Sequence, residues 1–155
     1  MNAYSDTSFL CAIYRKQDNT LEALAWRQSM TEPIFVTELL EFEFLQSIRL
    51  QVWLHDQDKR KGYGQSEADQ MIANWEADLA TGIAEIVACD SSAVMRQAAS
   101  LSRGHTAMGG HRTLDVLHVA TAVHLGAKEF LSFDSRQKKL AKAAGLRTPL
   151  ETVPR

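Results

Sequence analysis

The sequence is poor in the features that mark secreted and membrane proteins. Its 155 residues include two cysteines, Cys11 and Cys89, which lie in apolar surroundings without a CxxC spacing and predict reduced core residues. No basic region followed by an apolar run opens the chain, and no stretch approaches the ~20 apolar residues of a membrane span. These absences predict a cytoplasmic protein with no membrane partner.

Excess charge and nucleotide-binding motifs are equally scarce. The formal net charge is −2, so nucleic acid could be attracted only by a local basic patch and not by the protein as a whole. Neither GxGxxG nor GxxxxGK(S/T) occurs, which excludes the common dinucleotide and P-loop sites. With three prolines and no linker-like stretch, residues 1–155 are predicted to form a single domain.

Short β-prone runs alternate with longer helical patterns along the chain. This alternation is typical of βαβ units and predicts a three-layer α/β/α sandwich with a mainly parallel sheet of four to five strands. The predicted strands are residues 2–5, 34–37, 84–88 and 129–133, with an edge strand around 150–153. The predicted helices are residues 7–14, 20–29, 38–54, 66–82, 91–104, 112–127 and 135–144, and residues 55–64 and 104–112 are predicted loops.

An acidic residue follows each of the first four predicted strands. These residues are Asp6, Glu38, Asp90 and Asp134. Because the C-terminal ends of parallel strands form the functional edge of such a sheet, the recurrence predicts an acidic site there. Each acid is also suited to the start of a helix, and for Asp90, which two serines follow, N-capping is the favoured interpretation.

Asp115 poses a different problem. It lies in RTLDVLHVATAVHLGA (112–127), whose apolar residues spread nearly all round a helix, so the helix is expected to be buried. Burial of an ionised carboxylate without partners is strongly unfavourable. Thr113 is itself a good cap, so capping does not account for Asp115, and a charged partner is expected.

The predicted helix 38–54 carries three glutamates among apolar residues. Glu38 suits the first turn, where the helix dipole favours an anion. Glu43 shares a helix face with Leu39 and Ser47. Periodicity alone does not separate Glu43 from Glu41 as a site residue.

Three segments resemble the PIN domain, the nuclease fold of VapC-type toxins in bacterial and archaeal toxin–antitoxin pairs. YSDTSFL (4–10) resembles the opening strand with its Asp-Thr-Ser, and VTELLEFEFLQSIR (36–49) resembles the helix in which a glutamate follows a Thr/Ser-Glu-Leu start. RTLDVLHVATAVHLGAKEFLSFDSRQKKLAKAAGL (112–146) is the most specific segment. Its Leu-Asp-x-Leu-His-x-Ala-x-Ala core, its Phe-x-Ser-Phe-Asp and its Leu-Ala-x-x-x-Gly-Leu follow the family order and spacing.

The resemblance implies a set of site residues and an activity. The catalytic and metal-binding acids would be Asp6, Glu43, Asp115 and Asp134, with Glu43 selected over Glu41, and with Ser8 and Ser132 in support. Arg112 is added as a supporting residue because it lies within one helical turn of Asp115. The implied activity is that of an Mg²⁺- or Mn²⁺-dependent endoribonuclease, the toxin of a type II toxin–antitoxin pair. The implied partners are RNA as substrate, a cognate antitoxin and a second copy of the chain.

Electrostatics agrees with this set of residues. Two carboxylates about 4 Å apart repel each other by roughly 4 kcal/mol at an effective dielectric constant near 20. Four such groups at one sheet edge therefore need a cation, and hard ions such as Mg²⁺ and Mn²⁺ prefer oxygen ligands. On this argument the metal is the expected partner of Asp115.

Other functions fit the residues less well. Asp115 and His118 are spaced like a metal pair, but no second pair stands at zinc spacing. His118 is expected either to pack in the core or to support the acids from behind, as its place in the family motif suggests. Phosphoryl-transfer receivers and dehalogenase-type phosphatases need further acids beside Asp6. One alternative stays open, a non-catalytic or non-toxin PIN-domain protein that binds or processes RNA. Arg112 would hold either a substrate phosphate or an acidic neighbour.

The predicted helices 7–14 and 38–54 carry more apolar surface than one sheet face can cover. Their large apolar residues include Phe9, Tyr14, Phe42, Phe44, Trp53 and Leu54. Surplus apolar surface on a small domain marks a partner site. We expect a homodimer with open acidic pockets, and an antitoxin that reaches the acids with a basic side chain.

Overall fold

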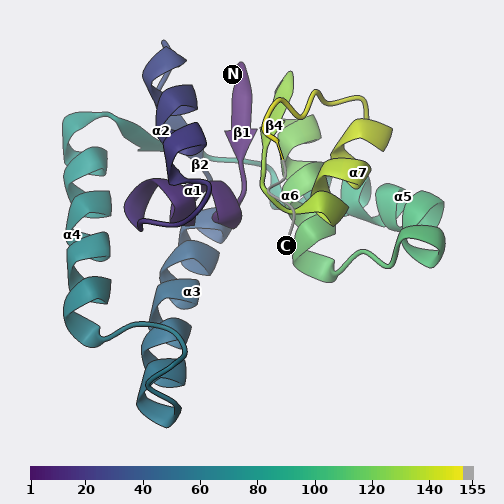
Figure 1. Ribbon diagram of the computed structural model, residues 1–155. Coiled ribbons are helices and arrows are strands. Elements are labelled where there is room, and N and C mark those ends of the chain that lie inside the picture. Colours follow the sequence, from purple (N-terminus) through teal and green to yellow (C-terminus); the bar gives the residue numbers. More distant parts are fainter. Residues whose placement is uncertain (152–155) are drawn as a thin grey trace.

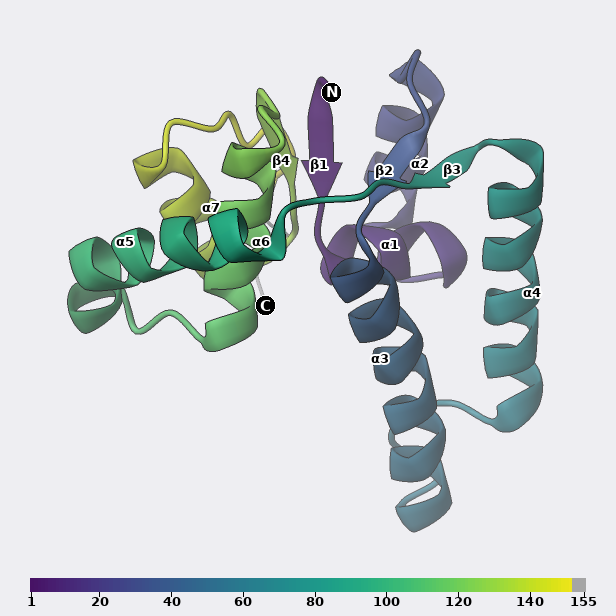
Figure 2. The ribbon, with the colours of Figure 1, turned by 180° about the vertical axis from the view of Figure 1, so that it is seen from behind.

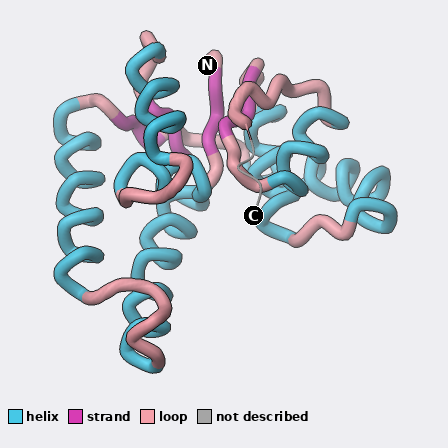
Figure 3. Tube along the Cα trace, in the orientation of Figure 1, coloured by secondary structure: helices cyan, strands magenta, loops and turns pink. Residues whose placement is uncertain are grey.

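The computed structural model describes residues 1–151 as a helix-rich α/β fold with short parallel strands (Figure 3). The strands are β1 (Ala3–Ser5), β2 (Ile34–Val36), β3 (Ala84–Ile86) and β4 (Glu129–Leu131). The helices are α1 (Thr7–Tyr14), α2 (Thr20–Ser29), α3 (Glu38–Gln57), α4 (Gln65–Thr81), α5 (Ser91–Gly109), α6 (Thr113–His124) and α7 (Ser135–Ala143).

The strands form two hydrogen-bonded parallel pairs, β1 with β4 and β2 with β3. The pairs lie side by side, with β1 next to β2 (Figures 1 and 2). A hydrogen bond of 3.2 Å between Tyr4 Oη and Thr37 Oγ1 links the two pairs near their C-terminal ends. All four strands therefore point the same way, and the loops that follow them share one edge.

Helices cover both faces of the strands, as the predicted α/β/α arrangement requires. Figure 1 shows α1 and α2 in front of β2 and α7 beside β4, whereas Figure 2, seen from behind, brings α5 and α6 forward. Helices α3 and α4 pack side by side and extend beyond the strands (Figure 1). The main core joins Tyr4 and Phe130 on the strands to Phe44, Ile48 and Trp75 on these two helices.

Most predicted elements are present, with different ends. Helix α3 continues to Gln57, and α5 continues through Gly104 to Gly109, so most of the predicted loop 104–112 is helical. The helix α5 is terminated by its C-cap residue Gly110, whose φ of 63° is the left-handed conformation that glycine adopts readily. The sequence predicted that this helix ends at Gly104, the first glycine of the segment, whereas the structure ends it at the last glycine, Gly110.

The C-terminal edge strand around 150–153 is not seen in the part of the chain that the structure describes. Leu150 and Glu151 belong to no strand, and residues 152 and 153 lie outside the described residues. A single parallel bridge between Glu129 and Arg147 extends the sheet beyond β4 instead. None of the helices within residues 1–151 is long and apolar enough to cross a membrane.

Candidate functional site

Asp6 lies at the end of β1, and the strand register determines its neighbours. Ser5 pairs with Leu131, and the Asp6 N–H continues the pairing with a 3.0 Å hydrogen bond to the Leu131 carbonyl. Ser132, the residue that follows β4, consequently faces Asp6, and its hydroxyl donates to Asp6 Oδ2 at 2.6 Å. The Ser8 hydroxyl donates to Asp6 Oδ1 at 2.6 Å, and the Phe9 N–H donates to the same oxygen at 3.0 Å. Asp6 is thus a helix cap and a buried carboxylate at once.

Burial and hydrogen bonding act on Asp6 in opposite directions. Burial, the larger effect, raises the pKa of this carboxyl, because the charged form loses its hydration. The hydroxyls of Ser132 and Ser8 and the Phe9 N–H lower the pKa, but they offset burial only in part. A cation near Asp6 would favour its ionised form.

Asp134 connects to Asp6 through Ser132. The Asp134 N–H donates to Ser132 Oγ at 2.9 Å, so one serine holds both strand-end acids in place. Asp134 Oδ1 caps α7 by accepting from the N–H groups of Arg136 and Gln137, at 2.8 and 3.0 Å. The other oxygen, Oδ2, faces the guanidinium of Arg112 at the start of α6.

Asp115 projects from the first turn of α6 and is 5% exposed. Its Oδ2 accepts from the backbone N–H of Arg112 at 3.3 Å and from Arg112 Nε at 3.1 Å. Its Oδ1 accepts from Gln137 Nε2 at 3.1 Å. Arg112 Nη2 also lies 3.8 Å from Asp134 Oδ2, so one guanidinium bridges two carboxylates.

These contacts change the interpretation of Asp115 in two respects. Arg112, and not Thr113, is the N-cap residue of α6, because Asp115 reaches back to the Arg112 N–H. Asp115 has a charged partner, as its burial requires, but that partner is Arg112 of the same chain. Burial of Asp115 alone is therefore no argument for a metal ion.

Glu43 approaches the same region from α3. Its Oε2 accepts from the Thr7 hydroxyl and from His118 Nε2, the latter at 2.7 Å. Glu41 faces elsewhere, since its Oε1 accepts from Trp75 Nε1 on α4 at 3.0 Å. Sequence periodicity left these two glutamates undecided, and the structure directs Glu43 toward α1 and α6.

The pKa of Glu43 reflects these partners. Its partial burial, the largest single effect, raises the pKa, but the hydrogen bonds from His118 and Thr7 and the nearby charges together outweigh burial and lower the pKa below its ordinary value. The positive charge of Arg112 acts in the same direction. Arg112 is therefore electrostatically coupled to Glu43 as well as to Asp115 and Asp134.

Hydrogen bonds and ion pairs connect three of the predicted acids, and residues of α1 and α6 hold the fourth, Glu43, nearby; these four acids are called the acid network below. Ser132 links Asp6 to Asp134, and Arg112 links Asp134 to Asp115. Glu43 joins α6 through His118. Within residues 1–151, however, no three His, Cys, Asp or Glu side chains are arranged to hold a metal ion as they stand. Their oxygens instead accept hydrogen bonds from hydroxyl, amide and guanidinium groups of the chain.

Sequence reasoning missed two of the groups that hold these acids. Thr7 binds Glu43 and Gln137 binds Asp115, and neither was singled out from the sequence. His118 was expected either in the core or in support of the acids, and it does both: it is fully buried and its Nε2 holds Glu43, while its Nδ1 has no partner among the described residues. The position of Thr7, directly after Asp6, was the one signal available.

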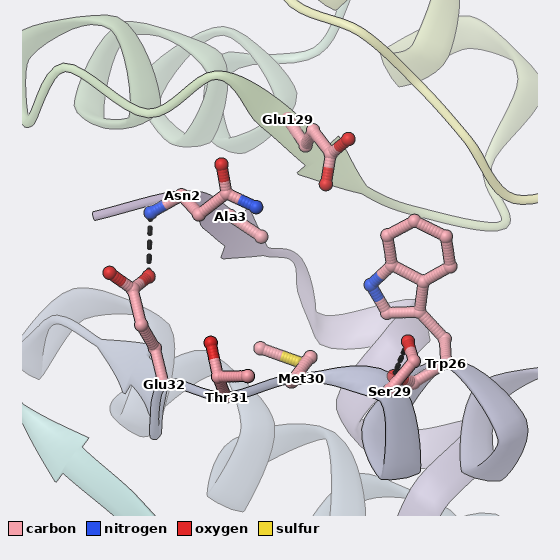
Figure 4. A pocket seen from close by; sticks show the side chains of 8 residues that line it. All are labelled: Asn2, Ala3, Trp26, Ser29, Met30, Thr31, Glu32 and Glu129. Carbon is pink, nitrogen blue, oxygen red and sulfur yellow. Dashed lines mark hydrogen bonds between the residues drawn. The ribbon is translucent and has the colours of Figure 1, made fainter.

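A cavity lies at the opposite edge of the strands and has a different character. It is lined by residues from the starts of β1 and β4 and the end of α2, among them Trp26, Glu32 and Glu129 (Figure 4). Its two carboxylates have partners in the chain: Glu32 accepts from the Asn2 N–H at 2.7 Å, and Glu129 pairs with Arg147 at 2.9 Å. The connected acids at the C-terminal edge remain the stronger candidate.

Comparison with known proteins identifies one family. The family model described as PIN domain matches residues 3–143, which include every residue of the acid network. No curated protein matches the sequence.

Proposed function

The chain belongs to the PIN domain family. We therefore propose that this protein is a divalent-metal-dependent endoribonuclease whose catalytic and metal-binding residues are Asp6, Glu43, Asp115 and Asp134. Proteins of this family are generally nucleases, and they typically use divalent metal ions. The observation that carries the proposal is the connection of Asp6, Asp134 and Asp115 through Ser132 and Arg112 at one strand edge.

The carboxylate oxygens at the C-terminal edge of the strands are the type of ligand atom that Mg²⁺ and Mn²⁺ bind. The four acids supply only carboxylate oxygens, which hard cations prefer, and a nearby cation would favour the ionised form of the buried Asp6. Asp6, Glu43, Asp115 and Asp134 would hold the ion once the guanidinium of Arg112 withdraws. A bound ion would supply an activated water and stabilise negative charge on the phosphodiester.

The other residues of the site position these acids. Ser8 and Ser132 fix both oxygens of Asp6, while Thr7 and His118 fix one oxygen of Glu43. The Arg112 side chain is 69% exposed, so its guanidinium is the group best placed to meet a substrate phosphate. Ser8, Ser132 and Arg112 thus act as supporting residues.

We further propose that the protein is the toxin of a type II toxin–antitoxin pair and acts in the cytoplasm as a homodimer. Support comes from the VapC-like motifs, from two free cysteines and from exposed apolar residues on α3. The antitoxin would place a basic side chain at the acids. The test is to co-purify this chain with the protein encoded by the neighbouring gene and to measure RNA cleavage. Cleavage that the neighbouring protein does not suppress would contradict the toxin role.

One observation favours a second function. Both oxygens of Asp115 accept hydrogen bonds from Arg112 and Gln137, an arrangement that suits a protein that binds or processes RNA without acting as a toxin, or without cleaving RNA at all. An RNA-binding assay run beside the cleavage assay separates these possibilities, because a non-catalytic protein would bind RNA and leave it intact.

Cleavage of end-labelled RNA in Mn²⁺ and in EDTA tests the proposal. We expect wild-type protein to cut only with the metal, and Asp6→Asn to cut at least about 100-fold more slowly, the scale on which loss of a preorganised charged group acts. Asp90→Asn is the matched control, because Asp90 also caps a helix after a strand but is exposed. Equal cleavage by wild-type protein and Asp6→Asn, or cleavage in EDTA, would refute the assigned site.

A further inference from the structure

The Arg112 guanidinium contacts both Asp115 and Asp134, two of the acids proposed to bind a divalent ion. We propose that the Arg112 guanidinium and a divalent ion compete for Asp115 and Asp134, so that Arg112 sets the metal affinity of the site. The inference rests on the proposed function in assuming that these carboxylates bind metal. It adds a regulatory element that belongs to the chain itself.

The contacts of Arg112 support this competition. Nε lies 3.1 Å from Asp115 Oδ2, Nη2 lies 3.5 Å from Asp115 Oδ1, and Nη2 lies 3.8 Å from Asp134 Oδ2. A guanidinium in this position partly neutralises both carboxylates and covers oxygen atoms that a metal ion would need. A divalent ion therefore binds these oxygens only if the guanidinium moves away.

The surroundings of Arg112 permit that movement. The Arg112 side chain is 69% exposed whereas that of Asp115 is 7% exposed, so the arginine can turn into solvent while the carboxylate stays in place. Asp115 would keep two hydrogen bonds, from the Arg112 backbone N–H and from Gln137 Nε2. Release of the guanidinium thus leaves the start of α6 intact.

The exchange also has a consequence for substrate binding. The charge of Arg112 lies close enough to Glu43 to lower its pKa, so the guanidinium influences three acids in its inward position. Once a metal ion takes over that neutralisation, the guanidinium becomes free to bind an RNA phosphate beside the acids. Metal binding would in this way prepare the site for substrate.

Isothermal titration of the metal-free full chain with Mn²⁺ tests the inference. We expect Arg112→Gln to bind Mn²⁺ about five- to tenfold more tightly than wild-type protein, because a competing and partly exposed positive charge is removed. Arg136→Gln is the matched control, since Arg136 is an exposed arginine two residues after Asp134. Its affinity should remain within about twofold of wild type, because the charge of an exposed side chain is screened.

A second measurement guards against misfolding. In EDTA, Arg112→Gln should unfold at a lower temperature than wild-type protein, and Mn²⁺ should raise its unfolding temperature by more. If Arg112→Gln does not fold, Arg112→Lys should show the same change in Mn²⁺ affinity with a smaller factor, because lysine lacks the bidentate fork.

Three outcomes would overturn the inference: unchanged or weaker Mn²⁺ binding by Arg112→Gln, equal tightening by Arg136→Gln, or no Mn²⁺ binding by any variant at millimolar concentration. RNA is absent from this experiment, so the two proposals fail separately. Tighter Mn²⁺ binding by Arg112→Gln in a protein that never cuts RNA would support the competition and refute the nuclease. If wild-type protein cuts RNA and Arg112→Gln binds Mn²⁺ with the same affinity as wild type, the nuclease would be supported and the competition refuted.

Discussion

Glu43 and Glu41 are chemically identical residues two positions apart on α3, and their surroundings give them different roles. Glu43 is one of the four acids of the acid network and accepts hydrogen bonds from Thr7 and His118. Glu41 accepts from the indole N–H of Trp75 on α4. The pair therefore offers a matched comparison in which charge, helix and residue type are held constant.

We expect Glu43→Gln to lower kcat for RNA cleavage by about 100-fold, because the site loses a preorganised carboxylate. Glu41→Gln should cleave RNA within about twofold of wild type, because Glu41 lies outside the acid network and the amide oxygen of the new side chain can still accept from Trp75. Steady-state cleavage rates at saturating Mn²⁺ check both expectations. A large loss in Glu41→Gln with normal cleavage by Glu43→Gln would reverse the assignment.

The residue scale also shows what spacing can and cannot predict. The apolar surroundings of Asp115 correctly required a charged partner for it. They could not decide between a metal ion and Arg112 as that partner, because the direction of a long surface side chain depends on its rotamer and on neighbouring charges. For the same reason the sequence did not predict the contact of Gln137, whose side chain donates to Asp115 from the neighbouring helix α7.

At the scale of elements, α3 both delivers Glu43 and presents an uncovered apolar face. Phe42, Leu50 and Trp53 are 63%, 47% and 57% exposed, whereas Phe44 on the same helix is fully buried in the core. The sequence predicted surplus apolar surface on this helix but could not sort Phe44 from Phe42. That distinction depends on the packing of α3 against Tyr14 and Trp75.

The exposed face of α3 leads to a prediction about assembly. We expect wild-type protein to be a dimer at micromolar concentration, and Phe42→Ser combined with Trp53→Ser to weaken its dimerisation at least about 30-fold, as loss of a large aromatic anchor does. Leu21→Ser is the control, since Leu21 is 83% exposed on α2. Light scattering over a concentration series measures the association.

A wild-type chain that stays monomeric at micromolar concentration would contradict the dimer. Dissociation by Leu21→Ser, with an intact dimer in the α3 double variant, would move the interface to α2. Phe44→Ser is not suited to this test, because Phe44 is a core residue and its loss would destabilise the fold.

Helix ends were harder to predict than helix positions. Helix α5 passes through Gly104 because a glycine inside a helix is only weakly unfavourable, and the residues after Gly104 continue the helical turns. The added turns bring the end of α5 to Gly110, two residues before Arg112. A sequence pattern that stops at the first glycine therefore misplaces the segment that leads into Arg112.

At the scale of the whole molecule, alternation of strands and helices was sufficient to predict the fold class. It was also sufficient to predict that Asp6 and Asp134, which follow β1 and β4, share an edge, because parallel strands end on the same side. Glu43 and Asp115 follow no strand directly, and the family resemblance was needed to select them. The division of the strands into two hydrogen-bonded pairs and the approach of α6 to α7 depend on long-range packing, which no local pattern records. The placement of Asp6 and Asp134 therefore follows from the fold, whereas the choice between the two roles expected for Arg112 required the structure.

The central claim is that Asp6, Glu43, Asp115 and Asp134 together form a divalent-metal site. Anomalous scattering at the manganese edge, from crystals grown with Mn²⁺, tests this claim most directly because it locates the ion without reference to activity. The account predicts a manganese peak at the C-terminal strand edge, in contact with carboxylate oxygens of Asp6 and Asp115. Manganese bound only elsewhere on the protein, with Arg112 still against Asp115 and Asp134, would contradict it.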